Sequence, residues 1–236
     1  MNNPLFSLLK RVAPPTLPNL SEIRFPSVDA VLGEMDKALK TLASKPIANR
    51  PNPGQEPAVG AIDIQLGDAE KTDVIGMMRV NHVGEICAQA LYQGQALASN
   101  DPKKKALFMH AAAEEADHLA WTQERLDELG GRPSLLNPVW YAGAFALGYV
   151  AGQMGDKVSL GFMAETERQV EQHLNSHLKR LPNQDLASRA ILEQMKVDEI
   201  EHGQTAKAEG AAPLPLPVKV AMTGMSKIMT TLAHKI

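Results

Sequence analysis

Apolar residues recur at helical spacing in several stretches of this chain, and proline or glycine separates the stretches. The pattern predicts helices over 27–42, from Thr72 or Asp73 to Ser99, and over 103–129, 156–181, 185–209 and 218–236. Asp185 and the Asn100-Asp101-Pro102 break supply typical helix starts, and Gly130-Gly131 and Pro182 supply typical stops. The sequence therefore predicts an all-α protein.

Two stretches differ in charge from the other apolar stretches of the chain. Residues 133–155 carry no formal charge, which fits either a buried helix of a bundle or a helix inserted in a membrane interface, with Trp140, Tyr141 and Tyr149 at that interface. Pro138, together with many Gly and Ala residues, makes a full membrane span the weaker interpretation. The final stretch, 218–236, combines an apolar stripe with three lysines and no acidic residue. It suits a membrane surface or docking on the bundle equally well.

The first 60 residues differ from the rest in composition. They hold nine of the sixteen prolines, and 45–57 has the composition of a linker. We therefore divide the chain into an N-terminal proline-rich arm over 1–60, with one possible helix, and a catalytic domain over 61–236 that includes the C-terminal amphipathic helix. The arm receives no chemical role. Residues 1–20 lack the apolar run of a secretory signal.

Charge and composition exclude some classes of function. A net charge of −3 and an aromatic content of 4% argue against nucleic-acid binding. The single cysteine, Cys87, cannot form an internal disulfide, which fits a reducing cytoplasmic setting. We expect Cys87 to pack as a small apolar residue and not to act as a nucleophile.

A repeated motif carries the chemistry. Glu115-Ala-Asp-His118 and Glu199-Ile-Glu-His202 are two copies of Glu-x-x-His, a spacing that places a carboxylate and an imidazole on one helix face. Glu85 precedes the first copy by 30 residues and Glu167 precedes the second by 32. One copy alone would fit a solvated surface helix. Two copies with matching glutamates predict a ferritin-like four-helix bundle with a di-iron centre, accompanied by additional amphipathic and apolar helices.

The predicted metal ligands, which are also the predicted catalytic residues, are Glu85, Glu115, His118, Glu167, Glu199 and His202. Such a set neutralises much of the charge of two divalent iron or manganese ions. It also leaves positions open for oxygen.

Several neighbouring residues compete for roles at this site. His82 is a rival ligand, although a role beside the ligands or on a polar face fits better; Glu165 and Glu171 would replace Glu167 in another register. Asp198 and Glu114 could each hydrogen-bond a histidine of the opposing helix, or could be simple surface charges. His173 would at most support the ligands. Solvated positions are expected for His110 and His177, and a core position for Trp121.

The motifs resemble those of the demethoxyubiquinone hydroxylases of ubiquinone biosynthesis. The resemblance rests on Met78-Arg-Val-Asn-His-Val-Gly-Glu85, Glu114-Glu-Ala-Asp-His118, Thr166-Glu167 with His173, and Asp198-Glu199-Ile-Glu-His202-Gly203. It covers residues 72–210 and the tail, and leaves 1–60 outside. It implies two iron ions per chain, held by the same six residues, with Glu115 and Glu199 bridging them.

The resemblance also implies a function. The protein would be a mono-oxygenase that uses O₂ to hydroxylate the ring of a polyprenylated benzoquinol. It would be peripherally attached to the cytoplasmic face of the cell membrane, and a ubiquinone-biosynthesis complex is a candidate partner. A ferritin-like iron-storage or peroxide-scavenging protein is the alternative with the same ligands. A metal-free helical interaction module is a third class.

Overall fold

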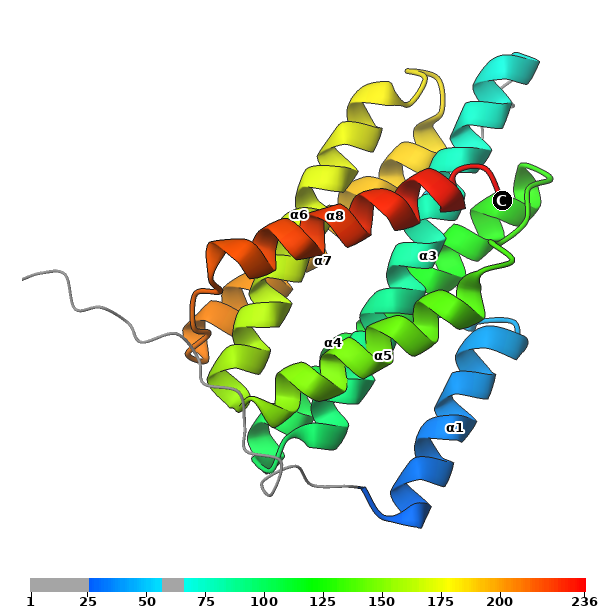
Figure 1. Ribbon diagram of the computed structural model, residues 1–236. Helices are drawn as coiled ribbons and strands as arrows, with labels where there is room; N and C mark the ends of the chain where they lie inside the picture. The colour runs from blue at the N-terminus through cyan, green and yellow to red at the C-terminus, as the bar shows by residue number, and fades with distance from the viewer. Residues whose placement is uncertain (1–25, 57–65) are drawn as a thin grey trace, which may run out of the picture.

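The computed structural model describes residues 26–56 and 66–236, and within them every regular element is helical (Figure 1). This confirms the all-α, ferritin-like prediction. The elements are α1 (Val28–Ala43), η3 (Pro53–Gln55), α3 (Asp68–Ala98), α4 (Pro102–Glu128), α5 (Asn137–Gln153), α6 (Asp156–Arg180), α7 (Leu186–Ala208) and α8 (Leu216–Ala233). The expected boundary near residue 60 and the expected absence of a signal in 1–20 fall outside the described residues.

The helix starts follow local hydrogen bonding. The Asp101 carboxylate accepts from the Lys103 amide at 2.8 Å and opens α4, and the Asp185 carboxylate accepts from the Ser188 amide at 3.0 Å and opens α7. The predicted start of α3 at Thr72 or Asp73 was wrong. Glu70 reaches back to accept from the Gly67 amide at 3.1 Å, which lets the helix begin at Asp68.

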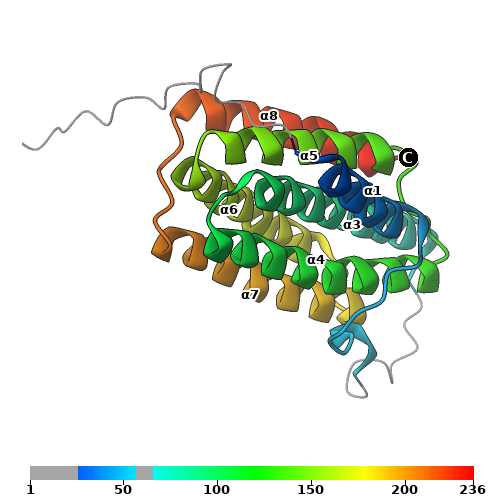
Figure 2. The ribbon, with the colours of Figure 1, turned by 90° about the horizontal axis from the view of Figure 1, so that it is seen from below.

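The helices lie in three layers (Figure 2). α4 and α7 form one outer layer, α3 and α6 the middle layer, and α5 and α8 the opposite outer layer, with α1 beside α3. The four helices that carry the predicted ligands, α3, α4, α6 and α7, therefore form the bundle. α5 follows α4 in the chain and packs along α3 before the chain enters α6.

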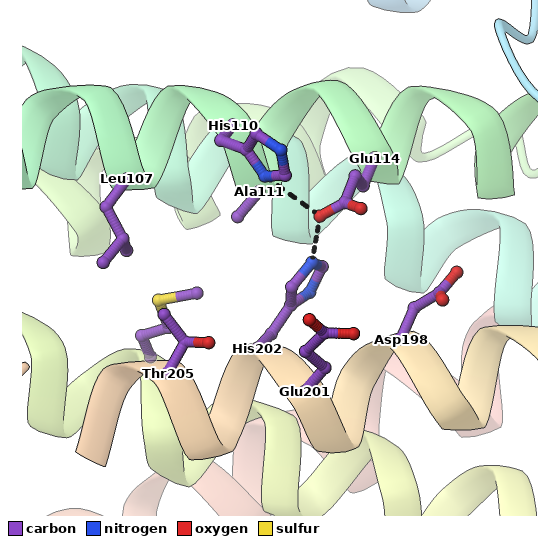
Figure 3. A pocket seen from close by; sticks show the side chains of 9 residues that line it. Leu107, His110, Ala111, Glu114, Asp198, Glu201, His202 and Thr205 are labelled. Carbon is purple, nitrogen blue, oxygen red and sulfur yellow. Dashed lines mark hydrogen bonds and ion pairs between the residues drawn. The ribbon is translucent and has the colours of Figure 1, made fainter. Parts of the chain in front are cut away.

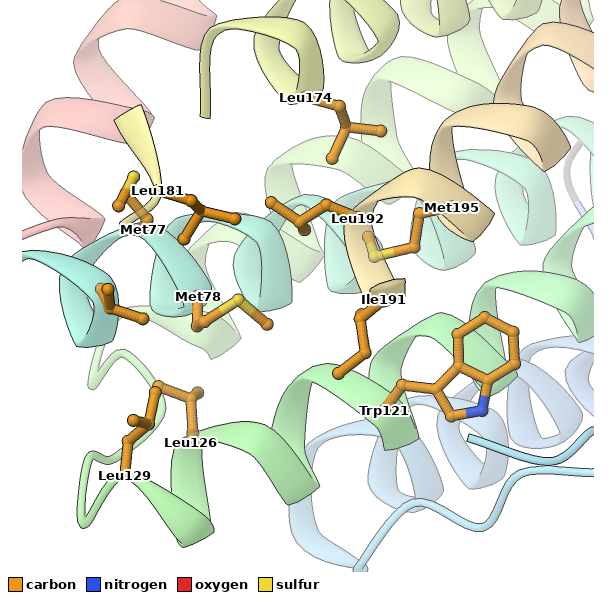
Figure 4. Packing of buried hydrophobic residues seen from close by; sticks show 11 residues of the cluster. Met77, Met78, Trp121, Leu126, Leu129, Leu174, Leu181, Ile191, Leu192 and Met195 are labelled. Atoms are coloured by element: carbon orange, nitrogen blue, oxygen red, sulfur yellow. The ribbon is translucent and has the colours of Figure 1, made fainter. Parts of the chain in front are cut away.

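Two apolar clusters fill the bundle at different heights. One joins α3, α4, α6 and α7 around Met78, Trp121 and Ile191, as Figure 4 shows. The other gathers around Tyr92, Phe108 and Leu160. On every bundle helix the predicted ligands lie between the residues of the two clusters, so apolar packing closes the space above and below them. Trp121 is a core residue, as expected.

The uncharged stretch 133–155 forms α5, and Pro138 lies in its first turn, where it does not interrupt the helix. One face packs closely on α3, because Gly94 and Gly148 bring the two backbones together: a Cβ on Gly148 would overlap the backbone of Leu91. The other face leaves Val139 and Val150 exposed. The interface placement of Tyr141 was wrong, because its ring is buried in a cluster with Ile86 and Ala90 of α3. No helix among the described residues has the length and apolar character needed to cross a membrane.

The C-terminal helix α8 is docked on the bundle along only one edge. Ala233 is buried in a cluster with Val80 and Val83 of α3, and Met229 packs against the same cluster. Apolar residues on the rest of α8 stay exposed, including Val220 and Ile228. Docking and an exposed apolar face therefore occur together, where the sequence had presented them as alternatives.

The segment predicted as a linker, 45–57, packs on the bundle over its described part. Gly54 of η3 is buried, with Ile191 and the Ala187 carbonyl so close that a side chain at this position would crowd them. The proline-rich composition suggested a flexible spacer, but the described residues form an ordered connection, in which each proline restricts its own backbone.

The preceding helix, α1, is joined to α3 by a hydrogen bond from the Thr41 hydroxyl to Gln89 Oε1 at 3.0 Å.

Candidate metal centre

The structure brings all six predicted ligand residues together in the middle of the bundle. Glu85 comes from α3, Glu115 and His118 from α4, Glu167 from α6, and Glu199 and His202 from α7. Every one is at least 94% buried. They form two overlapping groups in which one possible ligand atom from each residue lies within 4.8 Å of the others. Such a cluster can hold metal ions.

Two glutamates belong to both groups. Glu115 and Glu199 join Glu85 and His118 in one group, and join Glu167 and His202 in the other. His118 Nδ1 lies 3.1 Å from Glu115 Oε2 and 3.5 Å from Glu199 Oε1. His202 Nδ1 lies 3.4 Å from Glu115 Oε1 and 3.5 Å from Glu199 Oε2. The two shared carboxylates thus turn one oxygen toward each histidine, which is the arrangement that bridging ligands need.

The histidines are held from behind by carboxylates of the opposing helix. His118 Nε2 donates to Asp198 Oδ2 at 2.8 Å, and His202 Nε2 donates to Glu114 Oε2 at 2.7 Å. Metal-bound histidines generally make such a second hydrogen bond, which fixes the ring and its tautomer. These contacts confirm the predicted pairing of Asp198 and Glu114 with opposing histidines.

Unpaired buried atoms indicate that a cation fits here. Among the described residues, no hydrogen-bond partner is present for Glu85 Oε2, Glu115 Oε1, both Glu167 oxygens, Glu199 Oε2 or His202 Nδ1. Buried polar atoms normally have partners, because leaving a charged group without one is costly. Carboxylate oxygens and imidazole nitrogens in this number suit two divalent transition-metal ions.

The electrostatics of the cluster agree with that fit. Burial and the carboxylates of neighbouring glutamates raise the pKa of Glu85 and of Glu167 well above the ordinary value. Burial also acts on Glu115, but the neighbouring imidazoles of His118 and His202 outweigh it and lower its pKa. For His202, burial is outweighed by Glu115 and Glu199, which raise its pKa to about 12. These shifts reflect the concentration of negative charge in the cluster, which bound cations would offset.

Sequence reasoning missed two charged residues beside the ligands, Arg50 and Asp117. Arg50, in the segment taken for a linker, donates from Nε to Asp117 Oδ2 at 2.7 Å and from Nη1 to Asp198 Oδ2 at 2.8 Å. Burial lowers the pKa of Arg50, and the two aspartates more than restore it. Nothing in the spacing around Arg50 marks it, because its partners lie 67 and 148 positions away.

The rival ligands are not part of the cluster. His82 is buried, but its Nε2 lies 3.1 Å from Gln123 Oε1. Glu165 instead forms an ion pair with Arg168. His110 is largely exposed, as expected. The expectation for His177 was wrong: its ring is buried, and its Nδ1 lies 3.0 Å from Asn81 Oδ1, because α6 turns this face toward α3.

Cys87 is not built for nucleophilic chemistry. Its sulfur lies 3.5 Å from the sulfur of Met229, and burial raises the pKa of the thiol to about 12. A thiol in this state is almost entirely protonated at neutral pH. Packing is therefore its role, as expected.

A pocket of about 230 Å³ opens between α4 and α7 beside one of the histidines (Figure 3). Its lining includes His202, Glu114 and the exposed His110. Figure 3 shows the Glu114 carboxylate between the two rings, 3.2 Å from His110 Nδ1 and 2.7 Å from His202 Nε2. The pocket lies between α4 and α7, which form the outer layer opposite α5 and α8.

Comparison with known proteins places the chain. Residues 72–233 match the family model described as "Ubiquinone biosynthesis protein COQ7". The chain belongs to this family. It is 56% identical over 210 residues to the 3-demethoxyubiquinol 3-hydroxylase of Paraburkholderia xenovorans (strain LB400), covering 89% of this chain and 99% of the relative. The protein of that name from Ralstonia pickettii (strain 12J) is 53% identical over 216 residues, covering 89% and 100%.

These matches correct the expected limits of the resemblance. The match to the P. xenovorans family member covers 210 of the 236 residues. Only 26 residues remain outside it, so at least 34 of the first 60 lie within it. Much of the arm is therefore shared with relatives, and it is not an addition to the family's chain.

Proposed function

We propose that this chain is a 3-demethoxyubiquinol 3-hydroxylase of ubiquinone biosynthesis with a carboxylate-bridged di-iron centre. Relatives at 53 to 56% identity over most of the chain carry the first part of this proposal. The observation that carries the second part is the buried cluster of four carboxylates and two imidazoles, whose unpaired atoms call for cations. The enzyme is an oxidoreductase that inserts one atom of O₂ into the quinol ring.

The six ligand residues would hold two iron ions, with Glu115 and Glu199 between them. Bound iron supplies the two-electron chemistry that O₂ requires. The chain's own residues set the conditions. Asp198 and Glu114 hold the imidazole Nε2 protons, so that both Nδ1 atoms face the cluster. Apolar residues above and below the ligands exclude bulk water from the space between the four helices.

The substrate's isoprenoid tail suggests peripheral attachment to the cytoplasmic face of the cell membrane. α5 and α8 lie in one outer layer and expose apolar side chains, among them Val139, Val150 and Ile228. From residue 218 onward, the only formally charged side chains are those of Lys219, Lys227 and Lys235. This positive charge suits contact with an anionic lipid surface. We infer that this layer lies on the bilayer and admits the quinol ring from it.

Quinone profiling tests the proposed reaction. Cells that lack this protein should accumulate the demethoxy precursor, and the wild-type chain should restore ubiquinone. Purified protein should contain about two irons per chain, as expected for one di-iron site. Normal ubiquinone in the deleted cells would contradict the proposal. Assembly into a soluble iron-filled shell would instead favour the storage alternative.

A further inference from the structure

Arg50 connects two carboxylates that belong to different bundle helices. Asp117 comes from α4 and Asp198 from α7, and their side chains are only 4% and 9% exposed. The arginine reaches Asp117 Oδ2 through Nε at 2.7 Å and Asp198 Oδ2 through Nη1 at 2.8 Å. A guanidinium has donors fixed in a plane, so this bridge sets the distance and the direction of both carboxylates.

The carboxylate held by Arg50 is the one that orients His118. Asp198 Oδ2 accepts from Arg50 and also from His118 Nε2 at 2.8 Å, while Asp198 Oδ1 accepts from Gln194 Nε2 at 2.9 Å. Three donors on three sides leave this carboxylate little freedom to rotate. The His118 ring, which hydrogen-bonds to it, is held equally firmly.

Arg50 is itself locked in place by its surroundings. The backbone amide of Asn49 donates to Asp117 Oδ1 at 2.6 Å, and Trp121 Nε1 donates to the Arg50 carbonyl at 3.4 Å. The guanidinium carbon lies 4.9 Å from the centroid of the Trp121 ring, within the range of a cation–π contact. The N-terminal segment is thus anchored directly beside the metal centre.

The second histidine has no comparable support. Its carboxylate partner, Glu114, makes its other described contact with the ring of His110, whose side chain is 76% exposed. Glu114 also lines the pocket between α4 and α7 (Figure 3). The two halves of the ligand cluster therefore match in their ligands and differ in what stands behind the histidines.

We propose that Arg50 is a positioning residue of the metal centre: it fixes Asp198, and through Asp198 it fixes His118. The metal position that uses Glu85 and His118 is consequently held more rigidly than the one that uses Glu167 and His202. This inference rests on the proposed function in so far as that function supplies the two metal ions. It assigns a role to the N-terminal segment, which tethers one half of the centre.

The test is a titration of metal-free full-length protein with Co²⁺, followed by its visible absorption and by competition with a chelator. Arg50→Gln should weaken one of the two binding steps about 10- to 100-fold, the usual effect of removing such a support, and leave the other within about twofold. Arg50→Lys keeps the charge but lacks the planar fork, so it should show part of the same loss. Arg180→Gln, which breaks an ion pair with Asp73, is the matched control and should bind as wild type does.

Paired backgrounds identify the affected position. In the His202→Ala background, adding Arg50→Gln should weaken Co²⁺ binding at the position that keeps His118. In the His118→Ala background, adding Arg50→Gln should not change Co²⁺ affinity further, because the histidine that Arg50 supports is absent. Equal weakening of both steps, or wild-type binding by Arg50→Gln, would overturn the inference and leave the proposed function intact. Wild-type Co²⁺ affinity in Arg50→Lys would show that a positive charge alone suffices, and would also overturn the inference. If Arg50→Gln fails to fold, the Arg50→Lys result decides the question. Absence of Co²⁺ binding to the wild-type protein would overturn both proposals.

Discussion

His118 and Asp198 are 80 positions apart in the chain, and their side chains meet at 2.8 Å between Nε2 and Oδ2. An ionised carboxylate can only accept a hydrogen bond, so Nε2 carries the proton and Nδ1 is left as the nitrogen that faces the cluster. Glu114 does the same for His202 at 2.7 Å. α4 and α7 therefore each supply a ligand pair and the support for the other helix's ring.

Removing the charge from this support should weaken metal binding. We expect Asp198→Asn to lower metal affinity about 10- to 100-fold. A neutral amide lacks the negative charge that holds the proton on His118 Nε2. Competition with a chelator measures the affinity. Asp127→Asn lies on an exposed position of α4, where it accepts from Gln123, and is the matched control. Unchanged affinity in Asp198→Asn would contradict the orienting role.

Loss of a shared carboxylate should remove the metals without unfolding the helices. Glu199→Ala deletes a ligand that belongs to both groups, whereas the apolar clusters above and below it are untouched. Iron content and hydroxylation should fall to background while the helical circular dichroism persists. Glu171→Ala, on α6 outside both groups, should keep iron and activity. Retention of activity in Glu199→Ala would refute the ligand assignment.

Acid should destabilise the fold in part through His82. Burial lowers the pKa of His82 to about 4, from an ordinary value of 6.5. Below pH 6.5 the unfolded chain binds a proton that the folded chain does not, so the free energy of unfolding falls as the pH drops from 6.5 toward 4. The loss reaches about 3 kcal/mol at about 1.4 kcal/mol per pKa unit. Urea unfolding of wild type and His82→Gln at pH 7 and pH 5 should show a smaller decrease in the variant; equal decreases would contradict this cause.

The close approach of α3 and α5 should tolerate no methyl group at Gly148. A Cβ there would overlap the backbone of Leu91, so Gly148→Ala should reduce the free energy of unfolding by about 1 to 3 kcal/mol. Gly143→Ala lies on the same helix, where a Cβ would meet nothing within 4 Å. It should be neutral or stabilise by up to about 1 kcal/mol, since alanine is the better helix former. Thermal unfolding of both variants compares the two sites directly.

Attachment to anionic lipid should depend on the lysines of the C-terminal segment. Replacing Lys227 and Lys235 with Gln should reduce binding to vesicles containing anionic phospholipid about tenfold or more, at roughly 1 kcal/mol per lysine near the surface. Lys103→Gln with Lys105→Gln changes the charge equally on α4, in the opposite outer layer. That control should float with the vesicles as wild type does. Equal flotation of both double variants would argue against the proposed membrane-facing layer.

Local sequence information accounts for the helices and the ligand set. Helical spacing and capping residues such as Asp185 act within a few positions, so most boundaries of the described helices were predicted to within two residues. The start of α3 was missed because the Glu70 side chain accepts from the Gly67 amide, a contact that the search for a preceding Ser, Thr or Asp does not detect. The burial of His177 was missed because it depends on Asn81, 96 positions away.

The sequence by itself determined which residues meet in the proposed centre, since three-residue spacing on a helix and two halves of nearly equal length place four glutamates and two histidines in register. Only the tertiary structure decided what surrounds them. Arg50 reaches Asp198 because residues 45–56 fold back across α4 and α7, and no local pattern encodes a contact between residues 148 positions apart. Such contacts arise from the packing of whole helices, which places side chains together regardless of their distance along the chain.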